Sequence, residues 1–239
     1  MHTLSLYDLL FAFIPVGIVL VVMIYQSLQY KTALYALARM LLQLLVIGYF
    51  LIYIFESQNS FVVLATLSVM LAAASWIALR TVGEQRNALY LKALLSIGLG
   101  GGITLLLITQ VVIGLDPWYQ PSYMIPLAGM IFANAMTAIS LASERLNAEL
   151  KNERDYKKAS ARAYEAALIP VINGLFAVGL VSLPGMMTGQ ILSGISPLIA
   201  ARYQIMVMAM IFGASGLSVL IFLRLSQHHF NITKSPDVN

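Results

Sequence analysis

Seven apolar stretches of about 20 residues each decide what this chain can fold into. A helix of about 20 residues crosses the ~30 Å hydrocarbon core of a bilayer. The stretches lie at roughly 6–25, 34–55, 61–79, 93–114, 123–143, 166–184 and 203–224. Of the 239 residues, 60% are hydrophobic and only 10% are charged, which is more apolar surface than a soluble domain can bury. We therefore expect an all-α polytopic membrane protein, with residues 1–239 forming a single transmembrane domain.

The same composition excludes a soluble enzyme, a disordered chain and a nucleic-acid-binding module. The chain has no Cys, which excludes disulfides, zinc–thiolate sites and iron–sulfur clusters. Its histidines, His2, His228 and His229, lie outside the apolar stretches, which argues against a buried histidine metal site. A glycine-rich run has no following Lys-Ser/Thr, so it is no P-loop; Gly98 and Gly102 instead predict helix packing. We expect no bound cofactor and no covalent chemistry, and the sequence leaves the residues of any metal site unknown.

The basic residues predict an external N-terminus and a cytoplasmic C-terminus. This orientation places thirteen of the fourteen Lys and Arg residues on the cytoplasmic side, with only Arg202 outside. The first stretch is expected to be a retained helix and no signal peptide, because Asp8 and His2 replace a basic n-region and no small-residue cleavage site follows Ile24. We expect a multi-pass protein in lipid, in the inner membrane of a bacterium.

A charged segment, residues 144–165, separates the fifth and sixth stretches. It is rich in Ala and lacks Gly and Pro, which favours a helix. Two interpretations stay open, a solvated helical hairpin or a docking element for a cytosolic partner. For docking, Leu146 and Leu150 are four residues apart and predict an apolar anchor for a partner. The charges expected around this anchor belong to Arg154, Lys157 and Lys158.

The sixth stretch, 166–184, ends within the sequence Leu183-Pro184-Gly185-Met186-Met187-Thr188-Gly189. Pro removes a backbone donor and Gly permits a tight bend, and freed backbone groups in lipid must be paired or face water. The break predicts a gate at Pro184 and Gly185, a re-entrant turn, or an outer helix end. Methionine packing and interhelical amide hydrogen bonds are the alternatives to a solute path. The side chains expected on such a path are Gln43, Asn134, Met186, Met187, Thr188 and Gln204.

Four sets of residues form a recognisable pattern: Gly179–Gly189 with Tyr203–Val207, Ile125–Ile131 with Asn134–Met136, Arg39 with Gln43-Leu44 and Gly48-Tyr49, and Ala166–Pro170. Together they resemble the FetB-type family of ABC transporter permeases. The resemblance implies a permease subunit that works with a separate cytosolic ABC ATPase, which would bind the ATP. It also implies metal export, chiefly of iron, and a pair of permease chains around one pathway. The segment before Ala166 is shorter than in the family and lacks its Leu-Gly-Ala turn.

Two functions of other classes stay open. A self-sufficient carrier or channel would transport without an ATPase, although no span carries the central carboxylate that coupled carriers often use. A membrane scaffold or receptor would use residues 144–165 as its docking arm. The sequence fixes neither the metal nor the direction and stoichiometry of transport.

Overall fold

The computed structural model describes residues 6–56, 59–152 and 155–232. Within these ranges the chain is helical, apart from short connections and one isolated bridge between Val178 and Ser182. The all-α expectation is confirmed for this part of the chain. The chain divides into two compact units, Met1–Ser57 and Gln58–Asn239.

The first unit holds the helices α1 (Leu6–Ala12), α2 (Ile14–Tyr25) and α3 (Tyr30–Glu56). The first apolar stretch forms α1 and α2, and the second forms α3. No described side chain of α2 or α3 is buried in the structure, and Leu45 and Tyr49 are 70% and 74% exposed. Such a surface is costly in water but not against lipid tails, which are as apolar as leucine.

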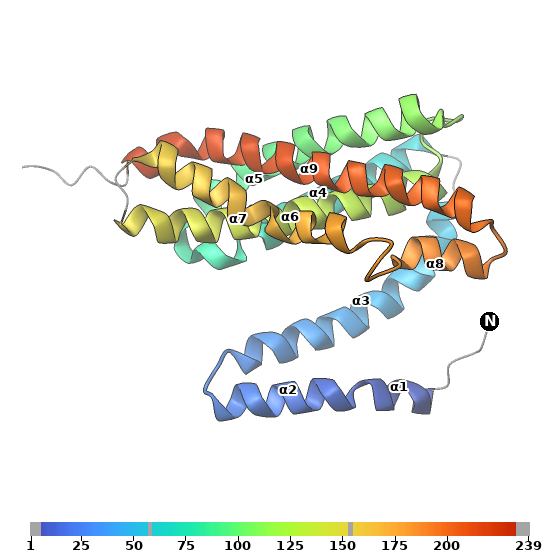
Figure 1. Cartoon of the computed structure of the whole chain (residues 1–239), viewed down its shortest axis with the longest axis horizontal. Coiled ribbons are helices and arrows are strands. Elements are labelled where there is room, and N and C mark those ends of the chain that lie inside the picture. The colour runs from blue at the N-terminus through green and yellow to red at the C-terminus, as the bar shows by residue number, and fades with distance from the viewer. Residues whose placement is uncertain (1–5, 57–58, 153–154, 233–239) are drawn as a thin grey trace, which may run out of the picture. The chain divides into compact units, whose positions relative to one another are not determined.

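The second unit is a helical bundle (Figure 1). Its core is α9, which packs against α5, α6 and α7, while α4 packs on α5 and α6. The elements are α4 (Ser60–Ala78), η1 (Arg80–Gln85), α5 (Arg86–Leu106), the π-helical η2 (Leu107–Ile113), α6 (Pro121–Asn152), α7 (Tyr156–Ala177), α8 (Gly185–Leu192) and α9 (Pro197–Ile232).

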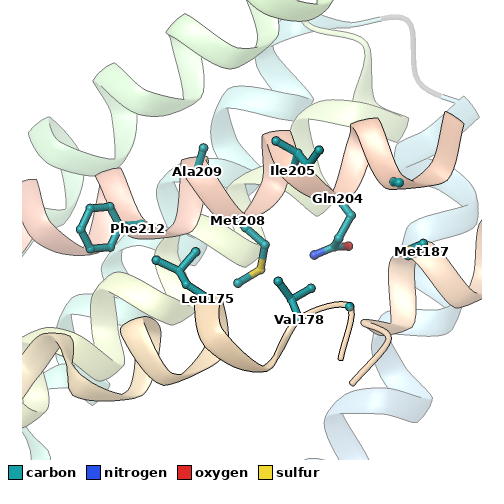
Figure 2. Close-up of a pocket in the computed structure, with 10 residues that line it drawn as sticks. Leu175, Val178, Met187, Gln204, Ile205, Met208, Ala209 and Phe212 are labelled. Carbon is teal, nitrogen blue, oxygen red and sulfur yellow. The ribbon is translucent and has the colours of Figure 1, made fainter. Parts of the chain in front are cut away.

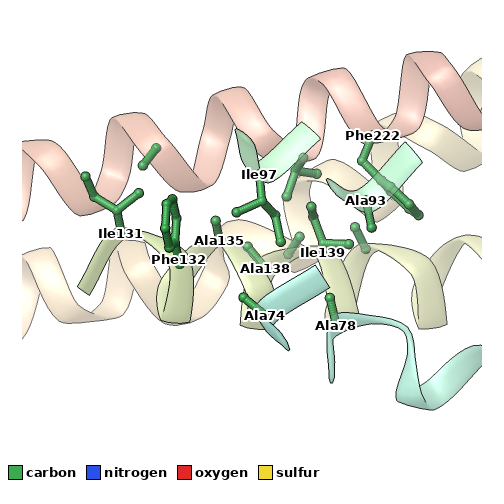
Figure 3. Packing of buried hydrophobic residues seen from close by; sticks show 14 of the residues in the cluster. Ala74, Ala78, Ala93, Ile97, Ile131, Phe132, Ala135, Ala138, Ile139 and Phe222 are labelled. Carbon is green, nitrogen blue, oxygen red and sulfur yellow. The ribbon is translucent and has the colours of Figure 1, made fainter. Parts of the chain in front are cut away.

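The core of this bundle combines small residues with a few large ones (Figure 3). Small residues let helix backbones approach closely, which is the main source of packing energy between helices in lipid. The closest approach is at Gly100 of α5, where an added Cβ would lie 2.7 Å from the backbone nitrogen of Ser218 in α9. The expected packing glycines are less close: a Cβ at Gly98 would make ordinary contact, and one at Gly102 would meet nothing within 4 Å. The glycine run does pack helices, but chiefly through Gly100 and Gly101; an added Cβ at Gly101 would lie 2.8 Å from the Ile131 side chain of α6.

Five helical segments are long and apolar enough to cross a membrane among the described residues, and the shorter segment Leu9–Tyr25 is also apolar. All seven expected stretches fall on helices, whereas the number seven and the orientation remain predictions. The sixth stretch was expected to reach residue 184, but α7 ends at Ala177. The five segments are Tyr30–Glu56, Ser60–Ala78, Arg80–Ile113, Pro121–Asn152 and Pro197–Phe230.

Candidate functional site

The predicted break between the sixth and seventh stretches is an irregular segment followed by the short helix α8. Gly179 adopts a φ of 84°, which favours glycine, and its amide donates to the carbonyl of Ser182 at 3.0 Å. Pro184 is the N-cap of α8, with extended φ and ψ of −61° and 148°. The break therefore combines a helix end with a separate helical turn. A gating role for Pro184 and Gly185 stays a prediction.

One cavity lies between α7, α8 and α9, and we call it the α7–α9 cavity. Its volume is about 530 Å³, and its walls are mostly apolar. Gln204 is only 5% exposed, and its side-chain oxygen has no hydrogen-bond partner in the described part of the chain. Figure 2 shows the Gln204 amide and the Met208 thioether directed into the same space, with Met187 nearby. The cavity thus places one buried amide and two thioethers in an apolar pocket.

A second cavity, the methionine cavity, has a volume of about 470 Å³. Three thioethers line it, from Met130 of α6, Met186 of α8 and Met206 of α9. Gln190 and Tyr203 add polar groups, and the buried side-chain oxygen of Gln190 is unpartnered among the residues that the structure describes. Ile113, at the end of the π-helical η2, also lines the cavity; single π-helical turns are frequent at functional sites.

The expected path residues do not form one site. Met187 and Gln204 share the α7–α9 cavity, whereas the adjacent Met186 faces the methionine cavity. Asn134 lines neither cavity, and its side-chain nitrogen donates to the carbonyl of Met130 at 2.8 Å. This is the helix-backbone hydrogen bond of an ordinary packed residue. Thr188 also lines neither cavity and donates weakly to the carbonyl of Leu183 at 3.5 Å.

Gln43 lies on α3 in the first unit. With the Gln43 amide oriented so that its oxygen faces the Arg39 guanidinium, this oxygen accepts from two Arg39 nitrogens, at 3.0 and 3.2 Å.

Sequence reasoning did not place Met130, Met206, Met208 or Gln190 on the path. Gln190 was visible as a polar residue beside the last span, but nothing in the sequence distinguished these methionines from packing residues. Among the described residues, no three His, Asp or Glu side chains form a group able to hold a metal.

The charged segment 144–165 forms the two arms of a helical hairpin, the end of α6 and the start of α7. Asp155 caps α7 by accepting from the amide of Lys157 at 2.9 Å. The expected anchor for a partner is wrong, because Leu146 is fully buried and Leu150 is only 9% exposed, so neither is available at the surface. Both leucines pack in the core of the bundle. Lys157 and Lys158 are exposed, and Arg154 lies outside the described residues.

Glu149 joins the two arms of the hairpin through ion pairs. Arg145 reaches one carboxylate oxygen at 2.5 Å, and Arg162 of α7 reaches the other at 2.7 Å. The hydrogen bond from Arg162 holds the pKa of the Glu149 carboxyl below its ordinary value, and the charge of Arg145 acts in the same direction. The carboxylate side chain is only 12% exposed. Glu149 therefore connects the two arms, while the arginine partners on either side of it are about half exposed.

Tyr156, the first residue of α7, ties the hairpin to α9. Its hydroxyl donates to the carbonyl of Leu223 at 2.5 Å, and burial raises the pKa of Tyr156 to about 12, so it stays a donor at neutral pH.

We expect Tyr156→Phe to lower the free energy of unfolding by about 1 kcal/mol, because the Leu223 carbonyl loses its hydrogen bond from the tyrosine hydroxyl. Thermal unfolding of the purified protein measures this. Tyr35→Phe, at a position that is 67% exposed, is the control, and an equal loss in both variants would contradict the prediction.

A polar groove lies beside the hairpin, between η1 and α6, and we call it the η1–α6 groove. Its volume is about 510 Å³. Arg86 follows η1 directly and links it to the end of α4. Its guanidinium stacks 3.7 Å from the Trp76 ring centre and donates to the Trp76 carbonyl at 2.6 Å. Sequence reasoning did not predict this groove, because it joins segments about sixty residues apart. Its polar lining residues are Thr81, Gln85, Glu144, Asn147 and Lys151.

Comparison with known proteins defines the family. A model of the uncharacterised protein family UPF0014 matches residues 6–231. The chain belongs to this family. It is 38% identical over 205 residues to the UPF0014 membrane protein slr1647 of Synechocystis sp., an overlap that covers 78% of each chain. The family match and the apolar helices together establish this UPF0014 member as a multi-pass membrane protein.

Two further relatives carry descriptive names. The chain is 34% identical over 215 residues to the probable iron export permease protein FetB of Escherichia coli, covering 84% of this chain and 82% of FetB. It is 33% identical over 226 residues to the protein ALUMINUM SENSITIVE 3 of Arabidopsis thaliana, covering 85% and 81%. No solved structure matches the chain. The resemblance to FetB-type permeases is confirmed, and the chain is a member of a membrane permease family.

Proposed function

We propose that this chain is the permease subunit of an ABC transporter that exports metal ions such as iron. The observation that carries the proposal is the 34% identity to the iron export permease FetB over 84% of the chain. Two cavities with thioether and amide groups beside the break at Pro184 support a solute path at this end of the bundle. The chain itself would bind no ATP, and a cytosolic ABC ATPase would supply the energy.

The partner would dock at the hairpin end of the second unit. Exposed Lys157 and Lys158 and the η1–α6 groove, with Glu144 and Lys151, offer polar contacts there. A hairpin whose arms are joined by Glu149 and tied to α9 by Tyr156 is suited to transmit a movement of the partner, because packed helices move as bodies. Two copies of the chain would enclose one pathway in the inner membrane of a bacterium.

Orientation can be tested directly. The α6–α7 hairpin, η1 and the end of α9 lie at one end of the second unit (Figure 1). These segments hold most of the basic residues that the structure describes in this unit: Arg80, Arg145, Lys151, Lys157, Lys158, Arg162 and Arg224. We expect Asn152→Cys to resist a membrane-impermeant thiol reagent in intact cells and Asp116→Cys to react. The chain has no Cys of its own, so the background is low. Labelling at 152 without permeabilisation would contradict the proposed orientation.

The function is tested by co-expressing the chain with a candidate ABC ATPase from the same genome. We expect the ATPase to co-purify with the chain, and Fe²⁺ to stimulate ATP hydrolysis when the pair is reconstituted in lipid. Iron loading of cells should fall when both proteins are expressed, and not with the chain alone. Lower iron loading with the chain alone would favour a self-sufficient carrier or channel. ATPase association without metal stimulation or export would favour a scaffold or receptor.

A further inference from the structure

The methionine cavity gathers three thioethers from three separate elements of the bundle. Met130 comes from α6, Met186 from α8 and Met206 from α9, and each is held partly buried against the core. Methionine is a soft ligand that favours soft cations. We infer that this cavity binds a soft monovalent metal ion, of the class of silver(I) or copper(I).

Oxygen groups in the same cavity complete the donor set. The side-chain oxygen of Gln190 is buried and has no hydrogen-bond partner in the ranges that the structure describes. Leaving such a group unpaired costs free energy, and a bound cation would remove that cost. Tyr203 and Ser122 also line the cavity and bring hydroxyl groups. Gln190 is on α8 with Met186, so the short helix supplies two of the donors.

The charge balance favours a monovalent ion. The described residues that line the cavity include no charged side chain, so the donors are all neutral. The cost of taking an ion out of water rises steeply with its charge, and neutral donors offset it less well than carboxylates. Arg202 lines an adjoining cavity of about 250 Å³ that shares Tyr203 and Met206. Its side chain is exposed, and salt screens exposed charges, so it does not exclude a monovalent cation.

The α7–α9 cavity provides a matched comparison within the same chain. It contains two methionines, Met187 and Met208, and also a buried unpartnered amide oxygen, from Gln204. It differs in having no third thioether and an almost wholly apolar wall. If any methionine in the chain binds a soft ion equally well, substitutions in either cavity should weaken binding to the same extent. If binding needs three converging thioethers, only substitutions in the methionine cavity should weaken it.

This inference rests on the proposed function only for the role of the site on an export path. Binding is measured on the purified full-length chain, without an ATPase, in chloride-free buffer and thiol-free detergent. Silver(I) is added, free ion is removed by gel filtration, and the metal retained per chain is determined by mass spectrometry. The absence of Cys means that no thiolate of the chain competes for the ion. We expect about one retained silver ion per chain.

The variants separate the two cavities. Met130→Leu, Met186→Leu and Met206→Leu together should weaken silver binding at least about tenfold, because all three sulfur donors are lost. Met187→Leu with Met208→Leu should leave it unchanged. Leucine has nearly the volume of methionine, and thermal unfolding checks that each variant is folded. If the triple variant does not fold, Met186→Leu and Met206→Leu are measured singly, with weaker binding expected for each.

Three results would overturn the inference. They are no retained silver in the wild-type chain, unchanged binding in the methionine-cavity variants, and equal loss in the variants of both cavities. The iron-export assay with the ATPase tests the proposed function separately. Iron export without silver binding would contradict the proposed site and support the permease function. Silver binding without iron export would support the site and contradict the proposed function.

Discussion

Gly100→Ala is expected to lower the free energy of unfolding by about 3 kcal/mol. The new Cβ would lie 2.6 Å from the Ser218 hydroxyl oxygen, 2.7 Å from its backbone nitrogen and 2.9 Å from its Cα. Two of these atoms are backbone, so no side-chain rotation relieves the contact and α5 must move away from α9. Overpacking of a fitted core typically costs about 1–3 kcal/mol, and a helix shift places this change at the upper end.

Gly102→Ala is the matched control for this prediction. It lies on the same helix, and an added Cβ there meets nothing within 4 Å. Alanine is the better helix former, so the control should be neutral or slightly stabilising, by up to about 1 kcal/mol. Unfolding in mixed micelles measures both variants. Similar stability of the two would mean that α5 and α9 do not approach as closely as the structure has it.

Leu146→Ala is expected to destabilise the protein by about 2–5 kcal/mol, the usual cost of a cavity in a packed core. Leu146 is fully buried near the end of α6, where the hairpin joins the bundle. The change removes contacts inside the protein and no contact with a partner. It should therefore lower the unfolding temperature of the purified chain in the absence of any ATPase.

The same substitution at an exposed leucine is the control, because it makes the same chemical change without leaving a cavity in the core. Leu91 of α5 is 63% exposed, so Leu91→Ala should change stability little. The sequence interpretation, in which Leu146 anchors a partner, makes the opposite prediction. A Leu146→Ala protein as stable as wild type, but unable to retain the ATPase, would restore that interpretation and contradict the packing described above.

Apolar length located the helices well, because a segment that crosses lipid must satisfy its backbone internally and has few other options. All seven expected stretches fall on helices, whereas the η1 turn and α8 were not foreseen as helical elements. Their sequences carry no long apolar run. The sequence predicts an end for α7 that lies too far along the chain. The extended backbone at Val178 and the left-handed Gly179 end the helix several residues before Pro184.

The site was harder to predict than the fold. The spacing of four residues correctly predicts that Leu146 and Leu150 lie on one face of a helix, but it does not say whether that face packs on a partner protein or on the same chain. In the structure it packs in the core of the helical bundle. Likewise, Met186 and Met187 are neighbours in sequence, and the helical step between adjacent residues turns them into different cavities. Convergence of Met130 and Met206 on Met186 depends on tertiary packing, which the sequence pattern does not encode.

The early end of α7 has a consequence for the membrane around the protein. From Ala166 to Ala177 the helix offers about a dozen uncharged residues, or ~18 Å, against a hydrocarbon core of ~30 Å. With α7 as the sixth crossing of the proposed arrangement, the rest of that crossing falls to the irregular residues 178–184, whose carbonyls need water or protein partners. In the proposed seven-span arrangement, these carbonyls pair either within the protein, as the Ser182 carbonyl does with the Gly179 amide, or with water that enters the membrane here. On the proposed export path, an ion would meet a dehydrating barrier thinner than the full hydrocarbon core wherever water reaches these carbonyls.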